Sequence, residues 1–210
     1  MMRTTQTRTE LLIQLHEYPD VVLLMQEVQA MLNLEADKRK DYRELIHENV
    51  SAEFINGEII YHSPAKRRHW RVSTNLTSLL NFFVKKWELG EVGVEKVMVA
   101  LTRNDYEPDI SFFSKEKASK FTDDQMLFPA PDFVVEILSP STEKYDRNEK
   151  FVDYAAHQVA EYWIIDPEQQ TVEQYLNKDG KFDLFQKLHR GSIESKVVSG
   201  FMVDLKDIFE

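Results

Sequence analysis

The chain has 210 residues, 42% of them hydrophobic and 11% aromatic, and its 36 acidic and 26 basic residues give a net charge of −10. This composition is typical of a globular protein with one main core, and it excludes a disordered chain. The absence of cysteine excludes disulfides and thiolate zinc sites, and the negative charge argues against a protein that grips nucleic acid over its whole surface. The longest apolar run near the start, Val21–Met25, is too short to span a membrane, so we expect a soluble, cytoplasmic protein without membrane contact.

The first 48 residues predict a helical arm. Apolar residues recur at roughly helical spacing from residue 9 onward, and Tyr18-Pro19-Asp20 predicts a break between two helices. The arm has more apolar positions than a free helix leaves in water. We therefore expect it to pack on the remaining chain or to join two chains in a homodimer.

Residues 49–210 predict a single α/β domain of the mixed α+β type. The dipeptide Asn56-Gly57 between two apolar runs predicts a β-hairpin with a type I′ turn. The further predicted elements are a helix at 66–88, strands at 92–101, 107–113 and 132–138, a helix at 143–158, a strand at 161–166, and a hairpin formed by 171–176 and 182–187. The central order is helix, three strands, helix, strand, with β additions on both sides.

Two acidic residues in apolar strands are candidates for a metal site. Glu136 interrupts a run that otherwise predicts a buried strand, and a buried carboxylate needs a cation or a donor. Asp132 lies four residues away along the same strand, about 13 Å, which is too far to share one ion with Glu136. Asp109 lies on another strand and can converge with Glu136 if the two strands pair. The alternatives are a turn residue after Pro108 for Asp109 and a buried lysine or arginine partner for Glu136.

Oxygen ligands with open positions favour Mg²⁺, or Mn²⁺ in its place, which polarises a phosphodiester. Such a site also needs a fixed positive charge. Leu138, two residues after Glu136, cannot supply this charge, but Lys150 on the following helix can. It forms a stripe with Asp146 and Tyr154 at four-residue spacing, and the alternative role for Lys150 is a surface ion pair with Asp146.

The dense basic run at residues 66–71 has two interpretations. It is either the solvated start of a helix or a patch that contacts substrate phosphates. The candidates for phosphate contact are Lys66, Arg67, Arg68 and Arg71.

Several motifs occur together across roughly residues 50–209. They are Glu53-Phe-Ile-Asn-Gly57, Ser63-Pro64 with His69, Pro108-Asp109, Pro131-Asp132 through Glu136 to Ser139-Pro140 and Thr142, then Asp146, Lys150, Tyr154, and Glu161-Tyr-Trp-Ile-Ile-Asp166-Pro167. As a set they resemble the Uma-type restriction endonuclease family, which belongs to the PD-(D/E)XK nuclease superfamily. The resemblance implies a restriction-endonuclease-like core of αβββαβ order and Mg²⁺-dependent cleavage of phosphodiester bonds.

The resemblance also implies roles for particular residues. Asp109 and Glu136 correspond to the metal-binding acids, and Lys150 would replace the motif lysine that is missing at Leu138. Glu53 is an accessory candidate for a metal ligand, and His69 is a candidate for contact with metal, water or phosphate. The main hypothesis is an endonuclease that acts on nucleic acid, with DNA as the expected partner. The alternative is a nuclease-fold binding or interaction module with weak or no catalysis.

Overall fold

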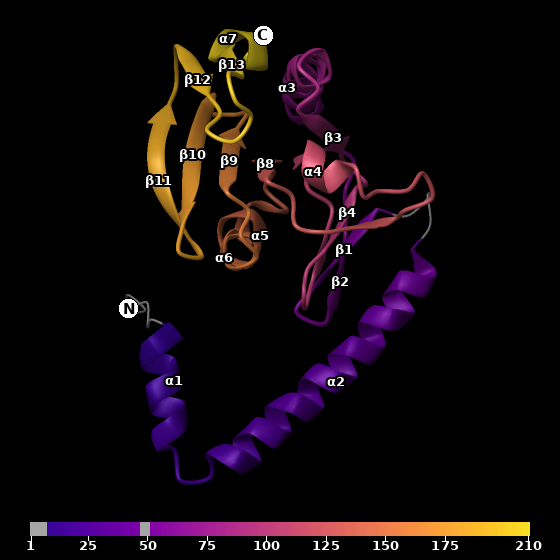
Figure 1. The fold of residues 1–210 in the computed structure, drawn as a ribbon, viewed down its shortest axis with the longest axis vertical. Coiled ribbons are helices and arrows are strands. Elements are labelled where there is room, and N and C mark those ends of the chain that lie inside the picture. Colours follow the sequence, from indigo (N-terminus) through magenta and orange to yellow (C-terminus); the bar gives the residue numbers. More distant parts are fainter. Residues whose placement is uncertain (1–7, 47–50) are drawn as a thin grey trace. The chain divides into compact units, whose positions relative to one another are not determined.

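The computed structural model describes residues 8–46 and 51–210 (Figure 1). The chain divides into two compact units, residues 1–45 and residues 46–210. The boundary that the sequence predicted, between residues 48 and 49, lies outside the described residues. Among the residues that the structure describes, no helix has both the length and the apolar character needed to cross a bilayer.

The N-terminal unit consists of helices α1 (Arg8–Glu17) and α2 (Val21–Leu45). The break between them occurs where the sequence predicted it, because a residue before proline disfavours helical backbone and Tyr18 precedes Pro19. The carbonyl of Tyr18 accepts a hydrogen bond from the amide of Val21, which starts α2. We refer to these two helices as the arm.

A six-stranded mixed sheet forms the centre of the second unit, in the order β11-β10-β9-β8-β6-β3. Only β8 and β9 are parallel neighbours, and the other pairs are antiparallel. The strands are β3 (Gly90–Val94), β6 (Ile110–Ser114), β8 (Phe133–Ile137), β9 (Glu161–Asp166), β10 (Thr171–Lys178) and β11 (Lys181–Leu188).

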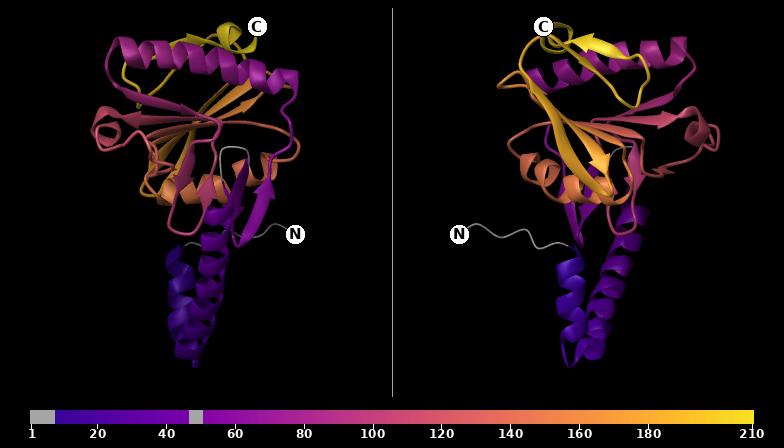
Figure 2. Two further views of the ribbon diagram at one scale, coloured as in Figure 1. Left: turned by 90° about the vertical axis from the view of Figure 1, so that its right-hand side faces the viewer. Right: turned by 60° about the vertical axis from the view of Figure 1, so that its left-hand side comes forward.

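Helices cover both faces of this sheet (Figure 2). Helices α3 (Arg67–Lys86) and α7 (Leu205–Phe209) pack on one face, against Val135 and its neighbours. Helices α5 (Glu143–Arg147) and α6 (Glu149–Ala156) lie on the other face, where Val134 belongs to a second apolar cluster. Because side chains alternate along a strand, Glu136 points to the same face as Val134, toward α6.

A smaller sheet has the order β2-β1-β5-β4-β7. Its strands are β1 (Ala52–Ile55), β2 (Glu58–Tyr61), β4 (Met98–Ala100), β5 (Asp105–Tyr106) and β7 (Leu127–Phe128). Asn56 and Gly57 have φ angles of 51° and 85°, and two successive positive φ angles are what a type I′ turn requires. The predicted hairpin is therefore confirmed, and it places the buried strand β1 beside β5.

The predicted core order is confirmed, with α3, β3, β6, β8, α5–α6 and β9 as its members, but two predicted elements are divided. The strand expected at 92–101 forms β3 and β4 in different sheets, because the chain bends at Glu95, whose φ is 52°. The helix expected at 143–158 is interrupted at Asn148, whose φ and ψ are −126° and −80°. The short helix α4 (Lys115–Ala118) was not predicted.

The C-terminal elements were also not predicted. A two-stranded sheet of β12 (Ser192–Glu194) and β13 (Met202–Asp204) leads into α7. The buried carboxylate of Glu161 in β9 fastens this region: it accepts hydrogen bonds from the Ser195 hydroxyl at 2.6 Å and from the amides of Lys196 and Val197 at 2.9 and 3.0 Å. A buried carboxylate is stable in such a position because donors surround it.

Candidate active site

Asp109 and Glu136 lie opposite each other at the ends of adjacent strands. Ile110 pairs with Val135 in the antiparallel register of β6 and β8, so the next pair along is Asp109 with Glu136. The amide of Asp109 donates to Oε2 of Glu136 at 3.4 Å. Oδ2 of Asp109 accepts a hydrogen bond from the amide of Ile137 at 2.7 Å, which fixes the orientation of this carboxylate.

Lys150 reaches this pair from α6. Its Nζ lies 3.2 Å from Oε1 of Glu136, 2.9 Å from Oε1 of Glu53 and 3.1 Å from Oδ1 of Asp146. Its side chain is only 2% exposed, so the Asp146–Lys150 pair is buried and is not the surface pair considered above. Leu138 belongs to the apolar cluster beneath α6.

The electrostatic balance of this cluster is negative, because three carboxylates share one ammonium. Burial lowers the pKa of Lys150, but the carboxylates of Glu136, Glu53 and Asp146 outweigh it and raise the pKa well above its usual value. Burial raises the pKa of Glu136 well above its usual value, and Lys150 offsets this only in part. Burial likewise raises the pKa of Asp146, to about 6. A further cation near these groups would be stabilised.

The first turn of α3 approaches the same site. Nε2 of His69 lies 3.4 Å from Oδ1 of Asp109. Burial lowers the pKa of His69, but the hydrogen bond and the charge of Asp109 outweigh burial, and the pKa is raised.

The basic run that contains His69 begins at the N-terminus of α3. Lys66, Arg67 and Arg68 are exposed, and Arg71 is half-buried. Nη1 of Arg68 lies 3.1 Å from Oε2 of Glu168, a contact at the surface. The helix places the exposed cations within one or two turns of the residue that contacts Asp109.

Sequence reasoning missed part of the polar cluster around Glu53. The amide of Glu107 donates to Oε1 of Glu53 at 2.8 Å, and the Ser51 hydroxyl donates to Oε2 of Glu107 at 2.7 Å. Nε2 of His62 lies 3.8 Å from Oε2 of Glu53 and 4.0 Å from Oε2 of Glu107. Burial raises the pKa of Glu107, and the hydrogen bond from Ser51 opposes this rise. Glu107 is more than 40 positions from Ser51, Glu53 and His62 in the sequence, so no local spacing predicted the cluster.

The buried Tyr154 hydroxyl is a second feature that the sequence did not reveal. Among the described residues it has no hydrogen-bond partner, although it is fully buried one turn after Lys150. Burial raises the pKa of Tyr154 well above its usual value, and the charge of Glu136 adds to the rise. The hydroxyl therefore stays protonated beside the charged cluster.

Asp132 does not join the cluster. Lys117 Nζ lies 2.8 Å from its Oδ1, and the amide of Ser114 donates to its Oδ2 at 2.7 Å. Burial raises the pKa of Asp132, but these two donors outweigh burial and the pKa is lowered. The contacts with Lys117 and Ser114 indicate a structural role for the Asp132 carboxylate.

The side chains around Asp109 and Glu136 suit some metal ions and not others. Within residues 8–46 and 51–210, no group of three or more histidine, cysteine, aspartate or glutamate side chains has the arrangement to hold one. Mg²⁺, however, keeps several waters and binds through only one or two carboxylates. Asp109 and Glu136 therefore fit Mg²⁺ in number and in chemistry, and they would not make a closed site for zinc.

A comparison with protein families matches residues 39–203 to the family described as "Uma2: Putative restriction endonuclease". The chain belongs to this family. The match begins inside α2, so most of the arm lies outside it.

Two proteins of Synechocystis sp. (strain ATCC 27184 / PCC 6803 / Kazusa) are similar to this Uma2 family member. "Uncharacterized protein sll1609" is 34% identical over 128 residues, which are 59% of this chain and 71% of that protein. "Uncharacterized protein slr1290" is 29% identical over 160 residues, which are 73% of this chain and 81% of that protein.

A solved structure has the same fold. It is described as a "putative nuclease belonging to DUF820 from Anabaena variabilis ATCC 29413". The TM-score is 0.69 at 22% identity, and the match covers 81% of this chain and 96% of that chain. Almost the whole Anabaena chain is matched, whereas about a fifth of this chain has no counterpart in it. The nuclease-like fold that the sequence predicted is confirmed.

Proposed function

We propose that this Uma2 family member is a metal-dependent endonuclease that hydrolyses phosphodiester bonds of nucleic acid, with DNA as its substrate. The observation that carries the proposal is the buried contact between Lys150 and Glu136, with Nζ 3.2 Å from Oε1. It supplies the acid and the cation of a nuclease site although Leu138 occupies the usual lysine position. In this proposal Asp109 and Glu136 hold the metal ion, which is Mg²⁺ or Mn²⁺.

When bound, the metal ion would polarise the phosphate and lower the pKa of the attacking water. The protein's own part is to fix its acids and its lysine. The amide of Ile137 holds one oxygen of Asp109 and leaves the other, Oδ1, beside His69. Lys150 is restrained by Glu53 and Asp146, so its charge stays next to Glu136, where it stabilises negative charge as the bond breaks.

The contacts of Glu53 favour a positioning role. Its Oε1 accepts from the amide of Glu107 and binds Lys150, so Glu53 helps to hold the ammonium beside Glu136. We assign His69 to orienting Asp109 and contacting a substrate phosphate. The exposed cations Lys66, Arg67 and Arg68 are proposed to bind further phosphates, since positive side chains at a helix N-terminus attract anions.

A second candidate function is a nuclease-fold binding module without catalysis. The observation that favours it is the full burial of Lys150 among three carboxylates, which restrains its ammonium from approaching a substrate. The two functions differ in one measurable property, because only the enzyme cleaves nucleic acid in a metal-dependent manner.

Two of the chain's Pro-Asp dipeptides, Pro108-Asp109 and Pro131-Asp132, provide a matched test. We expect plasmid DNA to be nicked in the presence of Mg²⁺ or Mn²⁺ and this activity to be lost in Asp109→Asn. Asp132→Asn, the control, should keep the activity, because Asp132 is held by Lys117 away from the site. Intact DNA with the parent protein under both metals would favour the binding module, and equal loss in both variants would contradict the assignment of Asp109.

We also propose that the protein acts as a homodimer. The arm carries many exposed large apolar side chains, and pairing of two chains through their arms would remove this surface from water. A dimer also suits cleavage of both strands of a duplex, because it carries two copies of the site.

A further inference from the structure

The arm has more exposed apolar surface than its two helices cover between themselves. Ten large aliphatic side chains of the arm before residue 35 are between 37% and 69% exposed. They are Leu11, Leu12, Ile13, Val22, Leu23, Met25, Val28, Met31, Leu32 and Leu34. At roughly 100 Å² each, they expose on the order of 1,000 Å² summed over all faces of the arm, of which a single interface covers the part on one face.

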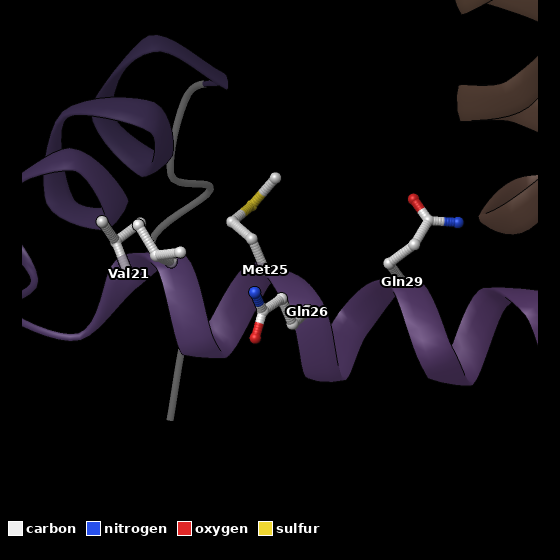
Figure 3. A pocket seen from close by; sticks show the side chains of 5 residues that line it. Val21, Met25, Gln26 and Gln29 are labelled. Carbon is white, nitrogen blue, oxygen red and sulfur yellow. The ribbon is translucent and has the colours of Figure 1, made fainter.

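Helices α1 and α2 cover little of each other's apolar surface. They diverge from the turn that joins them (Figures 1 and 2), and among the apolar residues up to Leu34 only Leu15, Val21 and Leu24 are half-buried. A groove of about 380 Å³ is lined by Val21, Val22, Met25, Gln26 and Gln29. Figure 3 shows Met25 and Gln29 extending from α2 on the side where the helices diverge.

One face of α2 has the spacing of a helix-pairing seam. Val21, Met25, Val28 and Leu32 are separated by four, three and four residues, which is the heptad pattern of paired helices. Glu27 is the single charged residue of α2 before Glu35. An apolar, nearly uncharged seam of this kind pairs well with a copy of itself.

The nuclease unit does not need the arm to complete its core. This unit, residues 46–210, has two apolar clusters built from its own strands and helices. The similar structure from Anabaena is matched over 96% of its length, although about a fifth of this chain has no counterpart in it. These facts favour a second copy of the chain, and not the nuclease unit, as the occupant of the seam.

We infer that two chains associate through their arms, with the α2 seams packed antiparallel. The heptad positions continue as Glu35 and Arg39, so a parallel pair in register would bring each of these charges against its own copy. In an antiparallel pair, Val21 lies opposite the partner's Leu32 and Met25 lies opposite the partner's Val28. The antiparallel contact between the two α2 helices then stays within their N-terminal, apolar halves. The inference rests on the proposed homodimer and is independent of nuclease activity.

The first test is the mass of the full chain in solution by light scattering. We expect twice the 24.7 kDa of one chain for the parent protein and a single chain for the variant Met25→Glu, Val28→Glu. The matched control is Leu23→Glu, Ala30→Glu, which puts the same charges on the opposite face of α2 and should remain dimeric. Circular dichroism checks that the variants keep their helices.

Each other outcome overturns the inference in a recognisable way. If the variant Met25→Glu, Val28→Glu is still a dimer, the homodimer proposal stands, but the chains associate through a surface other than the seam. A monomeric parent overturns both proposals. In that case a slow reaction of Val28→Cys with a thiol reagent shows that the nuclease unit covers the seam, and a fast reaction shows that a different partner is required.

Disulfide formation then decides the orientation, and the chain has no cysteine of its own to interfere. Mixed Val21→Cys and Leu32→Cys chains should form a heterodimeric disulfide when the helices are antiparallel. Neither variant alone should cross-link, because the two positions are eleven residue steps apart, about 16 Å along the helix, and a disulfide joins Cα atoms within about 7 Å. Cross-linking of Val21→Cys alone, without the mixed product, would show parallel packing and overturn the inference.

Discussion

Lys150 is the residue on which the proposed chemistry and the local stability both depend. Its Nζ lies 3.2 Å from Oε1 of the buried Glu136. Buried ion pairs contribute little net free energy when complete, but removing one partner leaves an uncompensated charge in a low-dielectric site. The cluster should therefore be far more sensitive to the loss of its lysine than a surface pair would be.

We predict that Lys150→Met abolishes cleavage and lowers the free energy of unfolding at pH 7 by about 3–5 kcal/mol. The methionine keeps much of the side-chain volume, so the loss reports the missing charge. Urea denaturation measures the stability, and plasmid nicking measures the activity. Lys144→Met, an exposed change in the preceding helix α5, should alter the free energy of unfolding by less than about 0.5 kcal/mol. An unchanged free energy of unfolding in Lys150→Met would contradict the electrostatic account of the cluster.

The sequence predicted the positions of some site residues better than others. Asp109 and Glu136 were paired because a carboxylate in an apolar strand needs a partner and adjacent strands lie within reach of one ion. Their roles as metal ligands stay predictions. The contacts of Glu107 with Glu53 and His62 could not be anticipated, because they depend on how β1 packs beside β5. That packing brings together residues separated by more than 40 positions.

At the scale of the elements, local signals predicted local structure. Asn56-Gly57 and Asp179-Gly180 both adopt the positive φ angles of tight hairpins, which the dipeptides themselves favour. Glu95, in contrast, adopts a φ of 52° within a continuous-looking apolar run, and its side chain gives no signal for that conformation. The division of the predicted strand 92–101 therefore depends on tertiary packing, which a single sequence does not display.

A single buried carboxylate ties α5 to the outer strands of the sheet. Oε2 of Glu173 in β10 lies 2.8 Å from Nη1 of Arg147, and Oε1 lies 2.9 Å from Nζ of Lys187. The Tyr175 hydroxyl also donates to it at 2.6 Å. Burial raises the pKa of Glu173, but these hydrogen bonds outweigh burial and lower the pKa to about 2.

This lowered pKa predicts a pH-dependent contribution to stability. The folded pKa is below the ordinary value of 4.5, so the contribution is fully present above pH 4.5 and is lost as the pH falls toward 2. Glu173→Gln should cost about 2–3 kcal/mol at pH 7 and progressively less from pH 4.5 downward. Glu143→Gln, which removes the exposed partner of the same Arg147, should cost less than about 1 kcal/mol at every pH. Urea denaturation at several pH values compares the two variants, and equal losses would contradict the account.

At the scale of the whole molecule, the charge is distributed unevenly. The net charge is −10, yet the N-terminal turn of α3 carries consecutive exposed cations next to the proposed site. A nucleic acid would therefore approach a protein of negative net charge and meet local positive charge at the N-terminal turn of α3. Such an arrangement directs a polyanion to the site and makes its affinity depend on a few contacts.

The salt dependence of DNA binding measures how many phosphates the protein contacts. Each phosphate contact to duplex DNA adds about 0.9 to the slope of log affinity against log salt, because a bound cation releases counterions. Lys66→Ala, Arg67→Ala should therefore reduce the magnitude of this slope by nearly 2. The control Lys85→Ala, Lys86→Ala removes the same charge from the exposed C-terminal end of α3 and should leave the slope unchanged. Fluorescence anisotropy of a labelled duplex, measured in the Asp109→Asn background so that the DNA stays intact, provides both slopes. Equal decreases in the two double variants would mean that net charge alone governs binding, and the phosphate contacts proposed at the start of α3 would then be wrong.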